Sequence, residues 1–386
     1  MPNFKLSRRD FLKATGASLF LAGIPLQGYT KDKPPGNISV IILEGGMDGL
    51  TAVPPFGDPS LVAMRESIMS DKYLKLNSFF GLHSRLKTLS SLMAIDNASI
   101  VHATAFPYQS RSHFEGQDLM EGGGLSPFSQ KTGWLGRSLE LAKIPGSALS
   151  LNMPLILRGY SENDTYFPAS IRNSTSLNAS LIDAISKVHS KAGSDIFKKV
   201  RNKSRLTLGN KPRDIVSLAE YAGKAIAQKN GPVASVIRIP LFDSHAHQDF
   251  KDPNSTLNHG RNLEQFDQVL AAYKKGLGDA WDNSIILTLT EFGRTVKVNG
   301  SWGTDHGFAS AGILAGGLIS KARVIADWPG LSNSEQFEGR DLMSTIDYRS
   351  VCAACIERAL GLDHDLIASE VFFDSKLPRI FDEIFS

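Results

Sequence analysis

The feature that most limits the fold is an apolar, β-branched run at residues 37–43, NISVIIL. Such a run, followed by the glycine-rich turn EGGMDG, predicts a strand buried within a sheet. Two more strands are predicted at residues 98–106, ASIVHATAF, and 283–295, NSIILTLTEFGRT, the latter ending at Glu291. The apolar run AGILAGGLIS indicates a further strand.

Helical patterns separate these strands. They cover residues 84–95, residues 262–280 and the late segment TIDYRSVCAACIERALGL. Strands that alternate with helices indicate an α/β fold with a largely parallel sheet. Residues 145–235 are richer in Ser, Asn and Lys and contain amphipathic stretches, so we expect a helical insertion there. Residues 37–386 would otherwise form a single α/β domain.

The first 30 residues have the pattern of a targeting segment, with a basic start and a modest apolar run. Lysine, glycine and proline interrupt that run, which makes it too short for a stable membrane span. The core SRRDFLK, residues 7–13, resembles a twin-arginine signal. We therefore expect export to the periplasm by the twin-arginine machinery, with cleavage near residue 30. A basic amphipathic helix on a cytoplasmic protein is the alternative.

The charge balance argues against nucleic acid as a partner. The 386-residue chain has a formal net charge of +3, and residues 1–30 hold four basic residues and one acidic residue. The remainder is therefore near neutral, and it carries no basic stripe with interleaved aromatic residues. The hydrophobic content of 42% and charged content of 21% are typical of a globular protein.

The segment FDSHAHQ places Asp243, His245 and His247 at alternate positions. On an extended segment all three side chains face one way, and on a helix Asp243 and His247 still meet. Carboxylate plus imidazole suits zinc, manganese or iron. The alternative is a polar loop with ordinary hydrogen-bonded histidines. Two histidines and an acid within five residues leave the two interpretations about equal.

Other acids follow predicted strands. Asp48 follows the first strand, Glu291 closes a later one, and the turn GTDHG holds Asp305 and His306. Ligands bind outside the carboxyl ends of the strands in open α/β sheets, so these residues could meet at one edge. Arg294 could hold a phosphate or sulfate with its guanidinium fork. A surface salt bridge between Glu291 and Arg294 is the alternative.

The segment PYQSRSHFEGQD contains Ser110, Arg111, Ser112, His113 and Glu115. A serine followed by a histidine at a helix start could supply a nucleophile and a ligand, provided that a base or metal lowers the pKa of the hydroxyl. Ser112 and Glu115 could equally form a capping box, and the two interpretations are compatible. The chain has no G-x-S-x-G elbow, no P-loop and no dinucleotide-binding glycine motif after a strand.

The ordered motifs EGGMDGL, SRSHFEGQD, TGWLGR, DSHAHQ, TEFGRTVKVNGSWGTDHG, DWPGL and DYRSV resemble the DUF1501 family, placed in the alkaline phosphatase–sulfatase superfamily. The resemblance implies an alkaline-phosphatase-like fold, with a largely parallel sheet sandwiched by helices, and a two-metal esterase site. It places metal ligands at the following positions: Asp48, Asp243, His247, Asp305 and His306, with Glu291 in a nearby acidic place. The nucleophile falls near Ser112, with Ser110 as the alternative.

The chain departs from the superfamily pattern at two places. A further histidine usually follows the Asp-His pair before the last helix, but the only later histidine is His364, after that helix. Either His245 substitutes for it or the second metal is absent. The C-x-P-S-R segment of sulfatases is also missing, so sulfatase chemistry of the usual kind is not expected.

Together these features predict an exported hydrolase of phosphate esters, or of related sulfate or phosphonate esters, in a small molecule or glycan. It would use one or two divalent ions, zinc, manganese or similar, to activate a serine or a water. Arg111 or Arg294 would hold the non-bridging oxygens. One alternative is a non-catalytic metal- or ligand-binding envelope protein with the same fold. Another is a single iron or manganese used for different chemistry.

Overall fold

Strand β1 (Asn37–Leu43) lies inside a mixed sheet, as its apolar run predicted. The computed structural model describes residues 36–69, 72–144, 146–151, 154–165, 214–248 and 259–386. The predicted signal segment, residues 1–30, lies outside the described residues, as do residues 166–213 of the predicted insertion. Among the described residues, no helix combines the length and apolarity that a membrane crossing needs.

The sheet has nine strands, in the order β10-β4-β9-β8-β1-β7-β5-β6, with β11 beside β4. All its pairings are parallel except those of β9, which runs antiparallel to both β4 and β8. A separate antiparallel pair is formed by β2 and β3. The strand bounds are β2 (Tyr73–Lys75), β3 (Gly81–His83), β4 (Ala98–Ala105), β5 (Ala148–Ser150), β6 (Asn163–Thr165), β7 (Ala234–Ile239), β8 (Ser284–Leu289), β9 (Ser310–Ala315), β10 (Val324–Ile325) and β11 (Ile346–Asp347).

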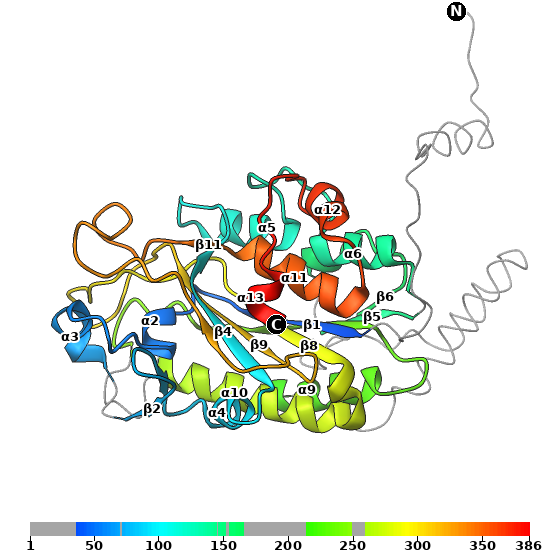
Figure 1. Cartoon of the computed structure of the whole chain (residues 1–386), viewed down its shortest axis with the longest axis horizontal. Coiled ribbons are helices and arrows are strands. Elements are labelled where there is room, and N and C mark those ends of the chain that lie inside the picture. Colours follow the sequence, from blue (N-terminus) through cyan, green and yellow to red (C-terminus); the bar gives the residue numbers. More distant parts are fainter. Residues whose placement is uncertain (1–35, 70–71, 145, 152–153, 166–213, 249–258) are drawn as a thin grey trace, which may run out of the picture. The chain divides into compact units, whose positions relative to one another are not determined.

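Helices cover both faces of the sheet (Figure 1). One face packs against α5 (His113–Gly122), α6 (Trp134–Ala142), α11 (Tyr348–Leu360), α12 (His364–Leu366) and α13 (Phe381–Phe385). The other packs against α4 (Lys87–Met93), α9 (Ile215–Ile226) and α10 (His259–Leu277). Shorter helices are α2 (Gly49–Ala52), α3 (Ser60–Arg65), η1 (Glu66–Ile68), η2 (Leu155–Leu157), η3 (Gly278–Asn283) and η4 (Ile367–Val371). The predicted α/β class, with a largely parallel sheet between helices, is confirmed.

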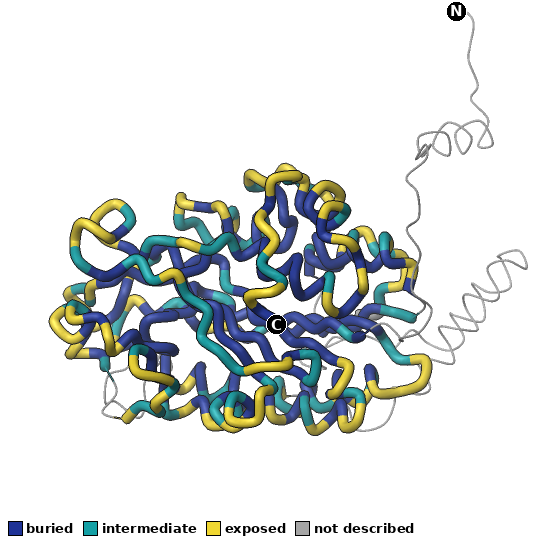
Figure 2. The backbone as a smooth tube through the Cα atoms, viewed as in Figure 1, coloured by how far each residue is buried: buried dark blue, intermediate teal, exposed yellow. Residues whose placement is uncertain are grey.

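Alternation along β1 explains why this strand is apolar throughout. Ile38, Val40 and Ile42 pack into the core on the α11 side. Ile41 and Leu43 pack into the core on the α10 side. Because β1 is buried on both faces, the side chains that point to either face are apolar, and the run is continuous. Figure 2 shows the result, with buried strands between exposed connections.

Several predicted elements differ in extent from the observed ones. Strand β8 ends at Leu289 and not at Glu291, because its pairing with β1 stops at Leu289 and the chain then turns away. Within the predicted insertion, the described residues include strands β5 and β6, which extend the sheet beyond β7. The insertion's bounds therefore stay a prediction. Cys352 and Cys355 are free thiols buried in α11.

His102, in β4, is fully buried and held in one neutral form. Its Nδ1 accepts a hydrogen bond from the Ala103 amide at 2.7 Å, so Nε2 carries the hydrogen and donates to the Val53 carbonyl at 3.0 Å. The ring stacks on Phe80 at 5.3 Å. Burial lowers the pKa of His102 from 6.5 to about 4, so this histidine remains neutral while the protein stays folded at mildly acidic pH.

The buried His102 should make folding stability depend on pH. The unfolded chain takes up a proton near pH 6.5, whereas the folded chain does so only near pH 4. Stability is therefore lost between these values as pH falls, by up to about 1.4 kcal/mol per pH unit from this group. Urea unfolding of His102→Gln should show a shallower pH slope than the wild type. Leu89→Ala, which opens a cavity in the same core, should be less stable but keep the wild-type slope. Equal slopes in all three proteins would contradict this role.

Candidate metal centre

Acidic and imidazole side chains of the predicted site lie together at one edge of the sheet. Strands β7, β1 and β8 are parallel neighbours, so the segments that follow them leave at the same edge. Asp243 follows β7 and Glu291 follows β8. His113 begins α5, after β4, and His306 precedes the antiparallel strand β9. Topology thus brings side chains from four distant parts of the chain to one place.

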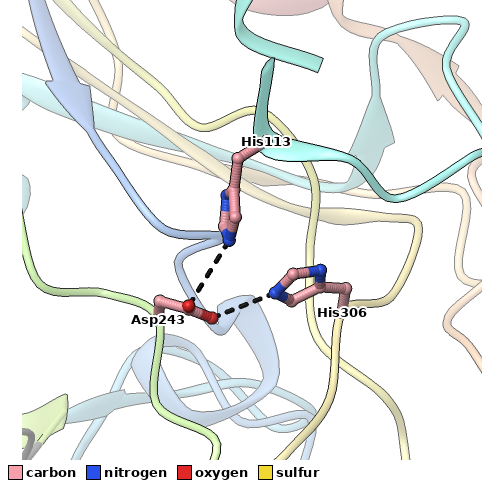
Figure 3. A group of neighbouring side chains, drawn as sticks. All are labelled: His113, Asp243 and His306. Carbon is pink, nitrogen blue, oxygen red and sulfur yellow. Dashed lines mark hydrogen bonds and ion pairs between the residues drawn. The ribbon is translucent and has the colours of Figure 1, made fainter. Parts of the chain in front are cut away.

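The carboxylate of Asp243 is the centre of this group (Figure 3). His113 Nε2 lies 3.4 Å from Asp243 Oδ2, and His306 Nε2 lies 3.1 Å from Asp243 Oδ1. The Nε2 atom of His245 lies 2.9 Å from the same Oδ1 and 3.0 Å from His306 Nε2. Among the residues that the structure describes, His113, Asp243 and His306 are the group whose ligand atoms all lie within 4.8 Å of one another.

Each of the three imidazoles forms a hydrogen bond through its Nδ1 atom, the ring nitrogen that does not face Asp243. The partner atom is in every case a carboxylate or carbonyl oxygen, which can only accept a hydrogen bond. Nδ1 must therefore carry the hydrogen, and Nε2 faces Asp243. The three bonds are His113 to Glu291 at 2.8 Å, His306 to the Arg111 carbonyl at 2.9 Å, and His245 to Asp305 at 3.1 Å.

A neutral Nε2 lone pair and a carboxylate oxygen repel each other at these distances. The arrangement is stable only when a proton or a cation lies between them. Hydrogen bonds to Asp243 and Glu291 raise the pKa of His113 to about 9, so a proton fills this role on His113 at neutral pH. Burial alone would raise the pKa of Asp243, but hydrogen bonds from His113, His306 and Arg294 hold it well below its usual range. The site therefore has a fixed anion ringed by nitrogen ligands.

Glu291 positions His113. Its Oε1 accepts from His113, from the Gly45 amide at 2.9 Å and from Gln117 Nε2 at 3.2 Å. Burial acts to raise the pKa of Glu291, but the hydrogen bond from His113 lowers it below the usual value. Gly45 has a φ of 116°, and a Cβ there would lie 2.3 Å from the Asp243 amide nitrogen. Only glycine lets the turn after β1 approach both Glu291 and Asp243.

Arg294 and Arg111 are both paired with carboxylates. Arg294 is buried, and its Nη1 donates to Asp243 Oδ1 at 2.8 Å, which fixes that carboxylate. Arg111 donates to Asp341 Oδ2 from Nε at 2.9 Å and also pairs with Glu338 at 2.5 Å. The catalytic role predicted for these arginines stays a prediction.

Asp48 and His247 lie outside the cluster around Asp243. Asp48 is 1% exposed, caps α2 through the Leu50 amide at 3.1 Å and pairs with Arg65 Nη1 at 2.6 Å. His247 is exposed, and its ring lies 5.7 Å from that of Trp302. Their predicted ligand roles therefore remain predictions without geometric support. Asp305 contributes by holding His245, as described above.

Ser112 occupies the N-cap position of α5, next to His113, but its side chain makes no capping hydrogen bond. The capping box is not formed, because the Ser112 amide and the Glu115 carboxylate both bond to Tyr108 instead. Its hydroxyl accepts from the Ser112 amide at 2.9 Å and donates to Glu115 Oε2 at 2.8 Å. Ser110 is exposed two residues earlier.

The ligand set predicted from the sequence lacked His113, although its segment was recognised. The useful signal was its position, since it begins a helix that follows a strand, as the other acids follow theirs. What could not be read from spacing is the pairing of His113 with Glu291, 178 residues away.

Residues 223–365 match the family model DUF1501, described as a protein of unknown function. The matched range contains Asp243, Glu291 and His306, and the match confirms the predicted resemblance over these residues. No curated protein matches the chain.

The chain is also similar to solved structures. The C-terminal periplasmic domain of EcEptC from Escherichia coli is 9% identical with a TM-score of 0.43, covering 91% of this chain and 88% of that one. The lipoteichoic acid synthase LtaP from Listeria monocytogenes is 11% identical with a TM-score of 0.41, covering 90% and 79%. A protein in the alkaline phosphatase superfamily from Vibrio parahaemolyticus is 10% identical with a TM-score of 0.37, covering 76% and 63%.

Replacing Glu291 with glutamine should weaken metal binding without removing a ligand. The amide cannot orient His113 as the carboxylate does, and loss of such a partner typically costs about 10- to 100-fold in affinity. Titration calorimetry with zinc chloride and manganese chloride measures this change. His247→Ala, in the same ligand-bearing segment, is the control and should bind as the wild type does. Wild-type affinity in Glu291→Gln would refute the positioning by Glu291.

Proposed function

We propose that this chain, whose residues 223–365 match the DUF1501 family, is an exported metal-dependent hydrolase of phosphate esters. The observation that supports the proposal is the convergence of three imidazole Nε2 atoms on the Asp243 carboxylate. A set of this kind at the carboxyl edge of an α/β sheet is suited to bind an ion beside a substrate.

The residues present fit a divalent ion such as zinc or manganese. His113, Asp243 and His306 would hold it. His113 Nε2 is buried and lies 3.4 Å from Asp243 Oδ2, so a bound ion would take the place of the proton between these two atoms. A bound ion would supply Lewis-acid chemistry, lowering the pKa of a nearby hydroxyl or water. Asp48 is neutralised by Arg65, so we propose one ion and not two.

Ser112 is the nucleophile in this proposal, because it adjoins the ligand His113 and its hydroxyl caps no helix amide. The pair of His245 and Asp305 is exposed at the same edge and suited to accept a proton. Arg294 would hold Asp243 in place, and the Arg111 carbonyl would hold His306. The chain's own groups thus supply orientation and proton acceptance around the reacting ester.

A second candidate is a metal-binding envelope protein without catalytic activity. One observation favours it, namely that both arginines predicted to hold the substrate anion already pair with carboxylates. In this candidate the ion would be retained but no ester would be cleaved, so activity measurements on the metal-loaded protein separate the two.

The proposed nucleophile can be tested with a pair of serine variants. Ser112→Ala should lower kcat on a panel of phosphate mono- and diesters by about 100-fold or more. Ser110→Ala, an equally small change two residues away, should keep wild-type kcat. Both variants should bind the wild-type amount of metal by elemental analysis. Wild-type kcat in Ser112→Ala would transfer the role to water, and a metal-loaded wild type that cleaves no ester would overturn the hydrolase.

Export can be tested on the full chain by cell fractionation. We propose that the twin-arginine segment directs the protein to the periplasm. Replacing Arg8 and Arg9 together with lysine keeps the charge and should leave the protein in the cytoplasm. Lys5→Arg, outside the arginine pair, should be exported normally. Export of the double variant would exclude this route.

A further inference from the structure

An exposed aromatic pair lies beside the proposed metal centre. Trp302 is 49% exposed, although tryptophan is usually well buried. Its ring lies 5.7 Å from that of His247, with an interplanar angle of 32°. His247 is two residues from His245, and Trp302 is three residues from Asp305, so both rings stand on the segments that form the centre.

The two segments are joined by their backbones. The His247 amide donates to the Ser301 carbonyl at 2.9 Å, and the Gln248 amide donates to the Trp302 carbonyl at 2.9 Å. Between them, a Cβ on Gly303 would lie 2.3 Å from the His245 carbonyl carbon, so no larger residue fits there. The loop that carries Trp302 therefore packs directly against the backbone of His245.

Both aromatic residues have a left-handed backbone conformation. Trp302 has a φ of 52° and His247 a φ of 49°. A bulky residue such as tryptophan rarely adopts this region. Glycine or asparagine would adopt the same turn at lower cost. The chain instead has a tryptophan here, and about half of this residue is exposed.

Polar side chains lie on the loop that carries Trp302. The Asp305 side chain is 52% exposed, and Asn299 donates to it at 3.1 Å. An exposed aromatic ring and an exposed carboxylate on one loop suit a ligand with an apolar face and hydroxyl donors at its edge. A sugar ring has both features, whereas an alkyl or aryl group would leave the carboxylate unmatched.

We propose that Trp302, supported by His247, binds the sugar ring of a phosphate ester whose phosphate is held at the metal centre. This inference rests on the proposed function and names its substrate class as sugar phosphates. Trp302 acts here on specificity, since its ring contacts the part of the substrate that does not react.

The test compares two esters that share the reacting group, glucose 6-phosphate and ethyl phosphate, on the zinc-loaded chain. Trp302→Ala should raise the KM for glucose 6-phosphate by about 3- to 10-fold, the amount typical of one aromatic contact. Its kcat, its zinc content and its KM for ethyl phosphate should stay unchanged. Trp302→Phe, which keeps a ring, should recover most of the loss.

Phe373→Ala is the matched control. Phe373 is also an exposed aromatic residue, at 42%, with a φ of 55°, but it packs on Arg137 at 4.7 Å. This control should behave as the wild type with both esters. An equal change in the KM of both esters in Trp302→Ala, or a loss of zinc, would show a structural role and overturn the proposal.

Saturation-transfer NMR with glucose 6-phosphate separates the failure of the two proposals. Sugar protons should receive magnetisation from the wild type and much less from Trp302→Ala, whether or not the ester is cleaved. Sugar binding that depends on Trp302 without any hydrolysis would retain the ring contact and reject the hydrolase. Hydrolysis that is indifferent to Trp302 would reject the ring contact and retain the hydrolase. Neither binding nor hydrolysis would reject both.

Discussion

The site depends on the Asp243 carboxylate, a fixed negative charge toward which three imidazoles and one guanidinium are directed. Each imidazole is held from behind by an oxygen that can only accept, so its second nitrogen must face the carboxylate. Without a cation between them, such groups repel unless protons intervene. Much of the surrounding structure serves to keep these groups converged against that repulsion.

A buried polar network provides this support. Arg294 donates to Asp243 and, at 3.2 Å, to the hydroxyl of Thr304. Thr304 donates to Gln248, which in turn donates to Asp48 at the first turn of α2. Asp48 is paired with Arg65. A satisfied network of this kind is rigid, because any member that moves leaves a buried partner unpaired. Asp48 therefore supports the candidate metal centre from a distance, through this network.

Several features of fold and site were predictable from residue patterns. The apolar run of β1 and the alternation of strands with helices led to the correct class of fold. The segments containing Asp243, His245 and His306 were identified because carboxylates and imidazoles cluster there within a few residues. Glu291 was predicted as a metal ligand from its place at a strand end, and the structure places its carboxylate on His113 Nδ1. Spacing cannot distinguish a residue that binds an ion from one that orients a histidine. His113 was considered as a ligand next to Ser112 but was not included in the predicted ligand set.

The sequence by itself determined which chemical groups are available and at which strand ends they stand, because periodicity and composition are local properties. Only the tertiary structure decided which of these groups contact one another. Whether an arginine meets a substrate or Asp341, and whether an acid faces an ion or Arg65, depends on contacts between residues far apart in the chain. Such contacts are set by strand order and by close approaches at glycines such as Gly45 and Gly303, which local patterns do not encode.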